Sequence, residues 1–365
     1  MKLQSLQTTF LILAILIAIV VILVFSKPFL VPVIIAALLS MLLLPVAKWF
    51  KQKGLNETFS IVLSILLLIS GLALFIGLIG WQLADLTQNF DEIEKQLTKN
   101  YHKAQEYVAS NLGISVEKQE QIKEKSESDS PGKIASFTLG ILKGAGGILT
   151  DTILVFVYIF LFICFRSYFK RFLLQYVPVA EHANARDVIS QVQKVCQKYL
   201  SGMALMIGIL WIMYGIGFTI AGVDNAIFFA ILCGILEIVP FVGNLIGTSL
   251  TLIMAFIQGG GGTLIIAIIV TYATIQFIQT YIIEPLIVGS EVNLNPVFTI
   301  LGLVAGELVW GVAGMVLAIP LLGITKIVCD HIEPLKPIGE LIGVDKKKNE
   351  KGLGKKIKGF FQKLT

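Results

Sequence analysis

Three glutamates lie inside long apolar stretches of this sequence, where a charged side chain is costly. They are Glu237, Glu284 and Glu307. Because a carboxylate within a bilayer is unfavourable unless it is used or paired, each one predicts a position that binds a cation or a polar solute. Each also has a structural interpretation. Glu237 can be a hydrogen-bonded or protonated buried group, and the other two can lie at the membrane surface near the end of a helix.

Proline and glycine residues beside these acids favour breaks in the helices. Pro240 follows Glu237 by three residues and frees a backbone carbonyl one turn earlier, while Gly243 permits a break or a close helix approach. Exposed backbone groups at a broken helix can bind an ion or a polar molecule. Neutral polar residues such as Gln276 and Gln279 suit the same path. The predicted path residues are Glu237, Pro240, Gly243, Asn244, Glu284, Pro285, Asn295, Pro296 and Glu307.

Signatures of catalysis, metal binding and cofactor binding are missing from the sequence. It has no His-Glu-x-x-His, no Gly-x-Ser-x-Gly and no phosphate-binding loop. The four cysteines occur singly, and the three histidines are far apart in sequence, so neither set predicts a disulfide framework or a metal site. We therefore expect no catalytic residue, no metal and no cofactor. Transport would be driven by an ion gradient or by passive flow, not by ATP bound to this chain.

The composition predicts an all-α polytopic membrane protein. Hydrophobic residues make up 56% of the chain, charged residues 15%, and the mean hydropathy is +0.83. Apolar runs of about 20 residues must form helices in lipid, because every backbone polar group needs an internal partner. About eight such helices are predicted, at 9–26, 28–47, 58–83, 145–166, 201–222, 226–257, 263–285 and 297–329. The sixth and eighth are too long for one straight crossing, so we expect them to be kinked, broken or re-entrant.

Lysine and arginine residues are distributed unevenly between the predicted helices. They follow the second and fourth spans and fill the C-terminal tail, whereas the short turns near Asp224 and Glu291 contain none. The positive-inside rule then places both termini in the cytoplasm. An even number of spans is consistent with that orientation.

Two segments outside the membrane complete the predicted organisation. Residues 84–144 contain apolar residues at steps of three and four, which predicts an amphipathic helix that either caps its own subunit or contacts another one. The contact candidates are Leu86, Phe90, Ile93 and Leu97. The tail at 336–365 is basic, with no nucleic-acid-binding fold beside it. The predicted domains are 1–83 (N-terminal membrane helices), 84–144 (insertion), 145–335 (membrane core with the transport site) and 336–365 (tail).

Several motifs resemble those of the autoinducer-2 exporter family, also described as PerM-like permeases. Outside the variable region 84–144, their order and spacing match over nearly the whole membrane portion. They are Pro32–Ser40 with Pro45–Lys48 and Gly54-Leu55, then Glu237–Gly243, then Glu284-Pro285 to Pro296, followed by Trp310–Gly314 and Ala318–Pro320. The sequence departs from the family at Asn295, where members often have histidine. Asparagine cannot take up a proton, which puts any proton role of that position in doubt.

The resemblance implies a multi-pass protein of a bacterial inner membrane. In some members it implies export of a small signalling molecule in quorum sensing, in others sodium/proton exchange, and in some a homopentamer. Three hypotheses follow. The first is a transporter or facilitator of a small polar solute such as autoinducer-2, and the second is a cation/proton antiporter for H⁺ or Na⁺. The third is a structural membrane scaffold, which the glutamates near proline and glycine disfavour.

Overall fold

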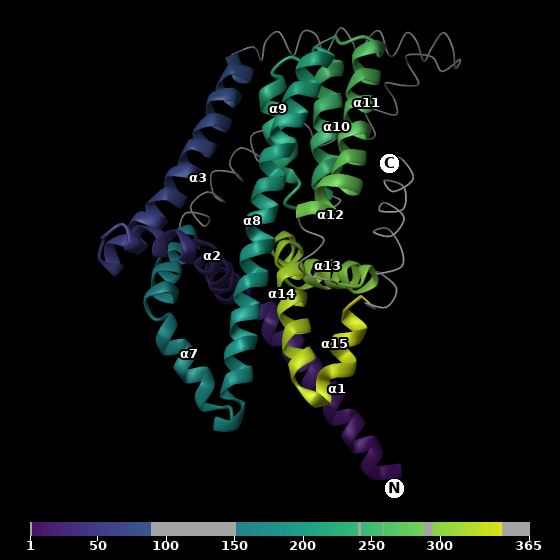
Figure 1. The fold of residues 1–365 in the computed structure, drawn as a ribbon. Coiled ribbons are helices and arrows are strands. Elements are labelled where there is room, and N and C mark those ends of the chain that lie inside the picture. Colours follow the sequence, from purple (N-terminus) through teal and green to yellow (C-terminus); the bar gives the residue numbers. More distant parts are fainter. Residues whose placement is uncertain (1, 89–150, 240–241, 258, 288–293, 345–365) are drawn as a thin grey trace, which may run out of the picture. The chain divides into compact units, whose positions relative to one another are not determined.

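The computed structural model describes residues 2–88, 151–239, 242–257, 259–287 and 294–344. Within these residues the elements are helices, joined by turns and one isolated bridge between Leu294 and Gly343. The predicted all-α class is therefore confirmed. Two compact units divide the chain, and Figure 1 shows their helices. Unit 1 comprises Met1–Ser64, Tyr158–Met206 and Ile282–Thr365, and unit 2 comprises Ile65–Val157 and Ile207–Tyr281.

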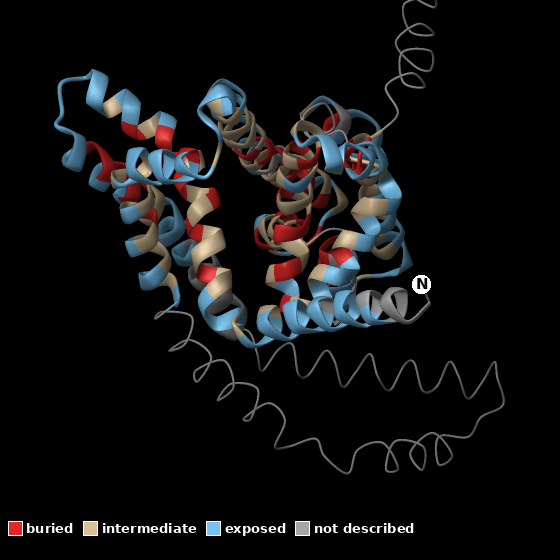
Figure 2. Ribbon diagram, turned by 90° about the horizontal axis from the view of Figure 1, so that it is seen from below, coloured by how far each residue is buried: buried red, intermediate tan, exposed pale blue. Residues whose placement is uncertain are grey.

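The N-terminal helices of unit 1 meet at a tight corner. Helix α1 (Lys2–Phe25) ends beside Ser26, and α2 (Lys27–Gln52) starts at once, with Pro28 in its first turn, where proline is tolerated. The side chain of Trp310 donates a hydrogen bond from Nε1 to the Leu23 carbonyl oxygen over 2.9 Å. The described side chains of α1 are otherwise exposed along most of its length (Figure 2). Such an apolar, exposed helix is what a lipid environment requires.

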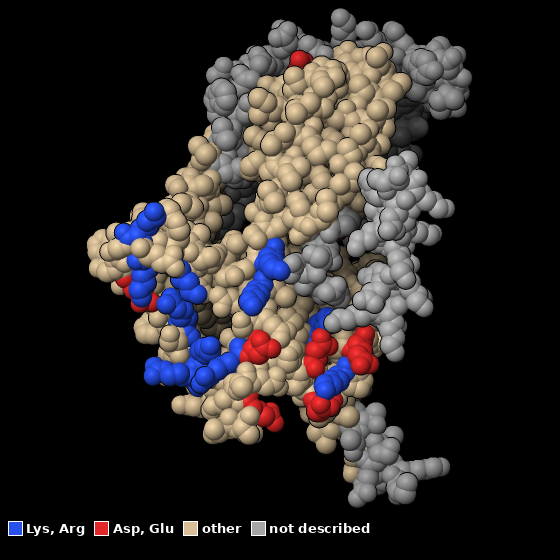
Figure 3. Space-filling model, viewed as in Figure 1, with Lys and Arg blue, Asp and Glu red and all other residues tan. Residues whose placement is uncertain are grey.

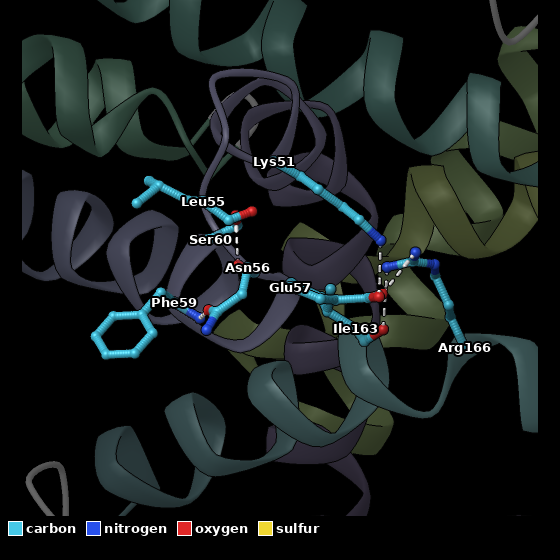
Figure 4. Close-up of polar contacts among 8 residues, drawn as sticks. All are labelled: Lys51, Leu55, Asn56, Glu57, Phe59, Ser60, Ile163 and Arg166. Atoms are coloured by element: carbon cyan, nitrogen blue, oxygen red, sulfur yellow. Dashed lines mark hydrogen bonds and ion pairs between the residues drawn. The ribbon is translucent and has the colours of Figure 1, made fainter.

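An ion-pair cluster joins three helix ends in unit 1. Helix α3 (Glu57–Gln88) begins with Glu57, whose carboxylate binds Lys51 Nζ at 2.8 Å and Arg166 Nη2 at 2.9 Å (Figure 4). Arg166 opens α7 (Arg166–Gln175), which is bent by 67° from the preceding helix Asp151–Cys164. Helix α8 (His182–Ala221) follows after the short 3-10 turn Val179–Glu181. Three chain segments are thus tied together at the cluster.

The predicted sixth span is two helices that fold back on each other. Helix α9 (Ala226–Leu236) and helix α10 (Val242–Ile257) pack antiparallel within unit 2, and α11 (Gly262–Ile278) packs against α10. The π-helix η2 (Gln279–Ile283) and α12 (Glu284–Ile287) continue from α11. The expectation of a broken or re-entrant span is confirmed here, in the form of a hairpin.

The predicted eighth span is also a hairpin, within unit 1. Helix α13 (Pro296–Trp310) ends at Gly311, whose φ of +66° is a left-handed conformation that glycine adopts without strain. Helix α14 (Val312–His331) then returns along α13, so that Gly306 and Gly314 approach backbone to backbone. The turn η3 (Glu333–Leu335) and helix α15 (Lys336–Ile342) pack on α14.

The described residues contain five helices that are long and apolar enough to cross a membrane, or six if the bent pair at Phe165 is one span. The sequence predicted about eight, and two of those are the hairpins described above. Large apolar side chains remain exposed on these helices, including Leu74, Ile220 and Leu308. Together these features describe a multi-pass membrane protein, since water-soluble domains do not expose apolar faces of this extent.

The predicted insertion and tail lie largely outside the described residues. Helix α3 runs on to Gln88 and includes Leu86, whereas Phe90, Ile93 and Leu97 fall in the part that the structure does not describe. Residues 345–365 of the tail also lie outside it. The domain boundaries and the oligomer contact remain predictions.

Candidate functional site

The turn between α9 and α10 depends on close backbone packing. Gly243 lies in the first turn of α10, and a Cβ added there would overlap the carbonyl oxygen of Leu236. One turn further on, a Cβ at Gly247 would lie 2.9 Å from Cys233 Sγ. Small residues at successive turns let two helices approach each other closely. Gly243, which the sequence predicted as a break or contact position, and Gly247 therefore allow the hairpin to close.

Glu237 lies at the point where α9 ends and the chain turns. Its side chain is buried, with 9% exposed, and its Oε1 accepts a hydrogen bond of 2.6 Å from Gln279 Nε2. Gln279 is itself buried and is the first residue of the π-helix η2. Short π-helical turns occur often at functional sites, because the added residue shifts the register of the side chains. A buried carboxylate is thus held by an amide from a second helical element.

A second chain of polar side chains crosses unit 2 through Asn244. Tyr214 of α8 donates a hydrogen bond from its hydroxyl to Asn244 Oδ1 over 2.9 Å. Asn244 Nδ2 donates in turn to Gln276 Oε1 of α11. Gln276 Nε2 then donates to Thr280 Oγ1 over 3.2 Å. Helices α8, α10 and α11 are therefore linked by uncharged polar groups within an otherwise apolar helical unit.

Two further polar atoms are buried near these groups in sequence. Thr248 Oγ1 and Gln279 Oε1 make no hydrogen bond within the described residues. A buried polar group without a partner costs about 1–3 kcal/mol. Thr251, by contrast, is satisfied, because its hydroxyl donates to the Gly247 carbonyl oxygen over 2.9 Å. Among the described residues of unit 2, these two atoms offer donor and acceptor capacity that a polar ligand can satisfy.

The sequence around these residues carries only negative charge. Residues 199–325 contain no lysine or arginine, but they contain five acids: Asp224, Glu237, Glu284, Glu291 and Glu307. On the face shown in Figure 3, helices α9, α10 and α11 present no basic side chain. Within unit 2, Glu237 therefore has no lysine or arginine near it in sequence, and its carboxylate favours positive charge and hydrogen-bond donors.

The remaining predicted path residues belong to other parts of the chain. Pro240 lies outside the described residues, and the side chain of Pro285 is likewise not described. Glu284 is the exposed first residue of α12, and Glu307 is exposed on α13. These two glutamates are therefore not buried carboxylates within unit 1.

Asn295 and Pro296 have a clear structural role. Asn295 is the N-cap of α13, and its Oδ1 accepts a hydrogen bond of 3.1 Å from the Val297 backbone N–H. Pro296 occupies the first helical position, where its missing N–H costs nothing. The pair starts α13, and a role in transport remains a prediction.

Sequence reasoning grouped Glu237, Gly243 and Asn244, and the structure brings all three to the turn of the α9–α10 hairpin. It did not include Tyr214 or Cys233. Both are buried, and Cys233 Sγ lies 3.9 Å from Thr251 Oγ1. The hydroxyl of Tyr214, within the apolar part of α8, was an available signal, because a buried tyrosine hydroxyl usually has a partner. Within the described residues no three of His, Cys, Asp and Glu lie close enough to hold a metal ion.

Comparisons with known proteins agree with this architecture. Residues 13–333 match the model of the AI-2E family transporter. The chain is similar to three inferred transport proteins. YrrI of Bacillus subtilis is 26% identical over 80% of this chain and 83% of its own. MT0215 of Mycobacterium tuberculosis is 25% identical over 78% of this chain and 77% of its own. YhhT of Escherichia coli K12 is 23% identical over 85% of this chain and 86% of its own.

Proposed function

The chain belongs to the AI-2E transporter family, and from that premise we propose that it exports a small polar solute of the autoinducer-2 class through unit 2. The family is one of transporters, which supports membrane transport as the function. In this proposal Glu237, Gln279 and Asn244 form the polar lining that the solute meets. The proton-motive or sodium gradient, or passive flow, would drive the movement.

The single observation that carries the proposal is the bond between Glu237 and Gln279 at the break between two short helices. A small furanosyl solute presents several hydroxyl groups, each of which needs an acceptor or a donor. The carboxylate of Glu237 accepts, the amides of Gln279 and Asn244 do both, and the hydroxyl of Thr248 does both. Because these groups are buried, a hydroxyl-rich solute gains hydrogen bonds there that water would otherwise supply.

The second candidate function is cation/proton exchange at Glu237. The absence of lysine and arginine from residues 199–325 favours it, because no fixed cation competes with a bound Na⁺ or H⁺ for the carboxylate. A structural scaffold has less support. A scaffold does not require a buried glutamate and glutamine at the turn of a hairpin.

The proposal includes the cellular setting. We place the protein in the inner membrane of a bacterium, with both termini in the cytoplasm and residues 84–144 outside. We also propose a homo-oligomer, with a pentamer as the form that family resemblance suggests. Aspartates at Phe90, Ile93 and Leu97 should then lower its native mass, whereas an unchanged mass would make 84–144 a cap on its own subunit.

Reconstitution in liposomes tests the function. Purified protein is assayed in parallel for efflux of labelled autoinducer-2 and, with a pH-sensitive dye, for proton movement in Na⁺ and K⁺ gradients. Solute flux above empty liposomes without Na⁺-dependent proton movement supports the solute exporter. Na⁺-dependent proton movement without solute flux would replace it with the antiporter, and no movement of either would favour the scaffold.

A further inference from the structure

Unit 1 contains a cavity of about 970 Å³ that the transport proposal does not use. Its walls come from α2, the helix Asp151–Cys164, α7, the first turns of α8 and the end of α14. Most of the lining side chains are apolar, among them Met41, Leu44, Phe162, Leu173, Val188 and Val328. This volume is at the upper end of the range of about 300–1,000 Å³ that is usual for small-molecule sites.

Basic side chains also line this cavity. They are Lys48 of α2 and Arg166 and Lys170 of α7, against one acid, Glu181. Figure 3 shows the lysines and arginines of unit 1 gathered over the end of α2, α7 and the first half of α8. A cavity with an apolar wall and an excess of positive charge is complementary to an anionic amphiphile.

The three cations are not equivalent. Arg166 is bound to Glu57, as the dashed lines in Figure 4 show, and it also approaches the Ile163 carbonyl oxygen at 3.4 Å. Lys48 and Lys170 make no ion pair within the described part of the chain and have exposed side chains. Arg166 therefore shares one carboxylate with Lys51, which offsets part of its charge, while Lys48 and Lys170 keep theirs for a ligand.

The composition of α7 favours a position for this cavity at the depth of the lipid headgroups. It bends by 67° away from an apolar membrane helix and carries basic residues together with exposed aromatic ones, Tyr168, Phe172 and Tyr176. Tyrosine and basic residues are enriched where the hydrocarbon meets water, and a helix of mixed basic and aromatic character lies along that boundary. Phe169 and Leu173 face the cavity from the same helix that supplies Lys170.

We propose that this cavity binds an anionic phospholipid, with its phosphate held by Lys48 and Lys170 and an acyl chain against the apolar wall. Basic pockets between membrane helices on the cytoplasmic side recognise anionic headgroups in this way. Free phosphate would leave the apolar wall unused, and a zwitterionic lipid would leave the positive charge uncompensated. All of its lining residues belong to unit 1 and none is a proposed path residue, so a bound lipid would act on the stability of unit 1.

Native mass spectrometry of the full-length protein in mild detergent tests the proposal. The probes are phosphatidylglycerol, phosphatidylcholine and inorganic phosphate, and each is titrated alone. Inorganic phosphate is also added as a competitor of the bound lipid.

The charge variant is Lys48→Gln with Lys170→Gln. Its matched control is Arg171→Gln with Lys194→Gln, which removes the same charge from exposed residues of α7 and α8 that do not line the cavity. Ala185→Trp fills the cavity from α8, and Ala185→Met replaces it if the tryptophan variant does not fold.

The expected result is that phosphatidylglycerol binds roughly tenfold more weakly to the charge variant than to the control pair. The filled-cavity variant should also lose the lipid, and phosphatidylcholine should bind at least tenfold more weakly than phosphatidylglycerol. Equal binding by the charge variant and its control would overturn the proposal, as would equal binding of the two lipids. The proposal is also wrong if the site takes a small anion. In that case inorganic phosphate would bind by itself, would displace the lipid, and would still bind to the Ala185→Trp variant.

Discussion

The Gln279 side-chain amide donates a hydrogen bond of 2.6 Å to Glu237 Oε1, joining the π-helical turn after α11 to the turn of the α9–α10 hairpin. Both side chains are buried. A buried carboxylate needs a hydrogen-bond donor as its partner when it is ionised, and it can also use an acceptor when it is protonated. A primary amide supplies both. Movement of η2 relative to the hairpin would therefore break this bond and expose Glu237 to a new partner.

We expect Glu237→Gln to reduce solute flux at least tenfold while yield and thermal stability stay normal. Glutamine keeps the size of the side chain and can still bond to Gln279, so only the charge is lost. Flux in liposomes, normalised to folded protein, is the measurement. The matched control is Asp224→Asn, an exposed acid in the turn before α9, which should transport normally. Unchanged flux in the glutamine variant would show that the charge has no role.

Gln279→Leu should lower stability by about 1.5–3 kcal/mol, the usual contribution of a hydrogen bond to a charged group. The cost arises because Glu237 stays buried after losing its donor. Thermal unfolding of the single and double variants of Gln279→Leu and Glu237→Leu measures the coupling between the two residues. Additive losses would mean that the 2.6 Å contact contributes nothing.

Gly243→Ala should prevent the α9–α10 hairpin from closing, because the new Cβ would overlap the Leu236 carbonyl oxygen. We expect a strong loss of folded, monodisperse protein in size-exclusion chromatography. Gly71→Ala is the control, since a Cβ there meets nothing within 4 Å and alanine is the better helix former. A normal yield of the Gly243 variant would contradict the close approach.

The breaks in the long apolar stretches were predictable from local signals. Proline and glycine near Glu237 favour a break, and Gly311 acts in the same way between α13 and α14. The signal is not decisive, because Pro32 and Pro45 lie inside α2 and Pro320 lies inside α14. The direction of the chain after each break was not predictable. It depends on backbone contacts such as Gly306 against Gly314, which no local pattern encodes.

The partners of the site residues also escaped prediction. Gln279 is 42 residues from Glu237 in sequence, and Tyr214 is 30 residues from Asn244. Such pairings depend on how helices pack, and the π-helical register that places Gln279 has no sequence signature of its own. Asn295 differs, because a local signal indicates its role as a cap, although the sequence was interpreted there only as part of the path. An asparagine before a proline at the start of an apolar run is a local cap signal, and the structure contains that cap.

Residues 84–144 should be accessible from outside the cell. The test uses Ser128→Cys with Cys164→Ser, because the other three native cysteines are buried. A membrane-impermeant maleimide should label intact cells or spheroplasts as fully as lysed ones. Labelling that appears only after lysis would reverse the orientation that the lysine and arginine distribution predicts.

Asn295→Ala should cost about 1 kcal/mol of stability, typical of a lost N-cap, without reducing flux per folded protein. The reason is that Asn295 Oδ1 accepts from the Val297 backbone N–H, which otherwise has no partner in the first turn of α13. Asn295→Asp and Asn295→Ser supply the same acceptor and should retain most of the stability. Thermal unfolding and liposome flux are measured on all three. If all three lose flux while alanine unfolds at the same temperature as the parent, Asn295 acts on the solute path and not as a cap.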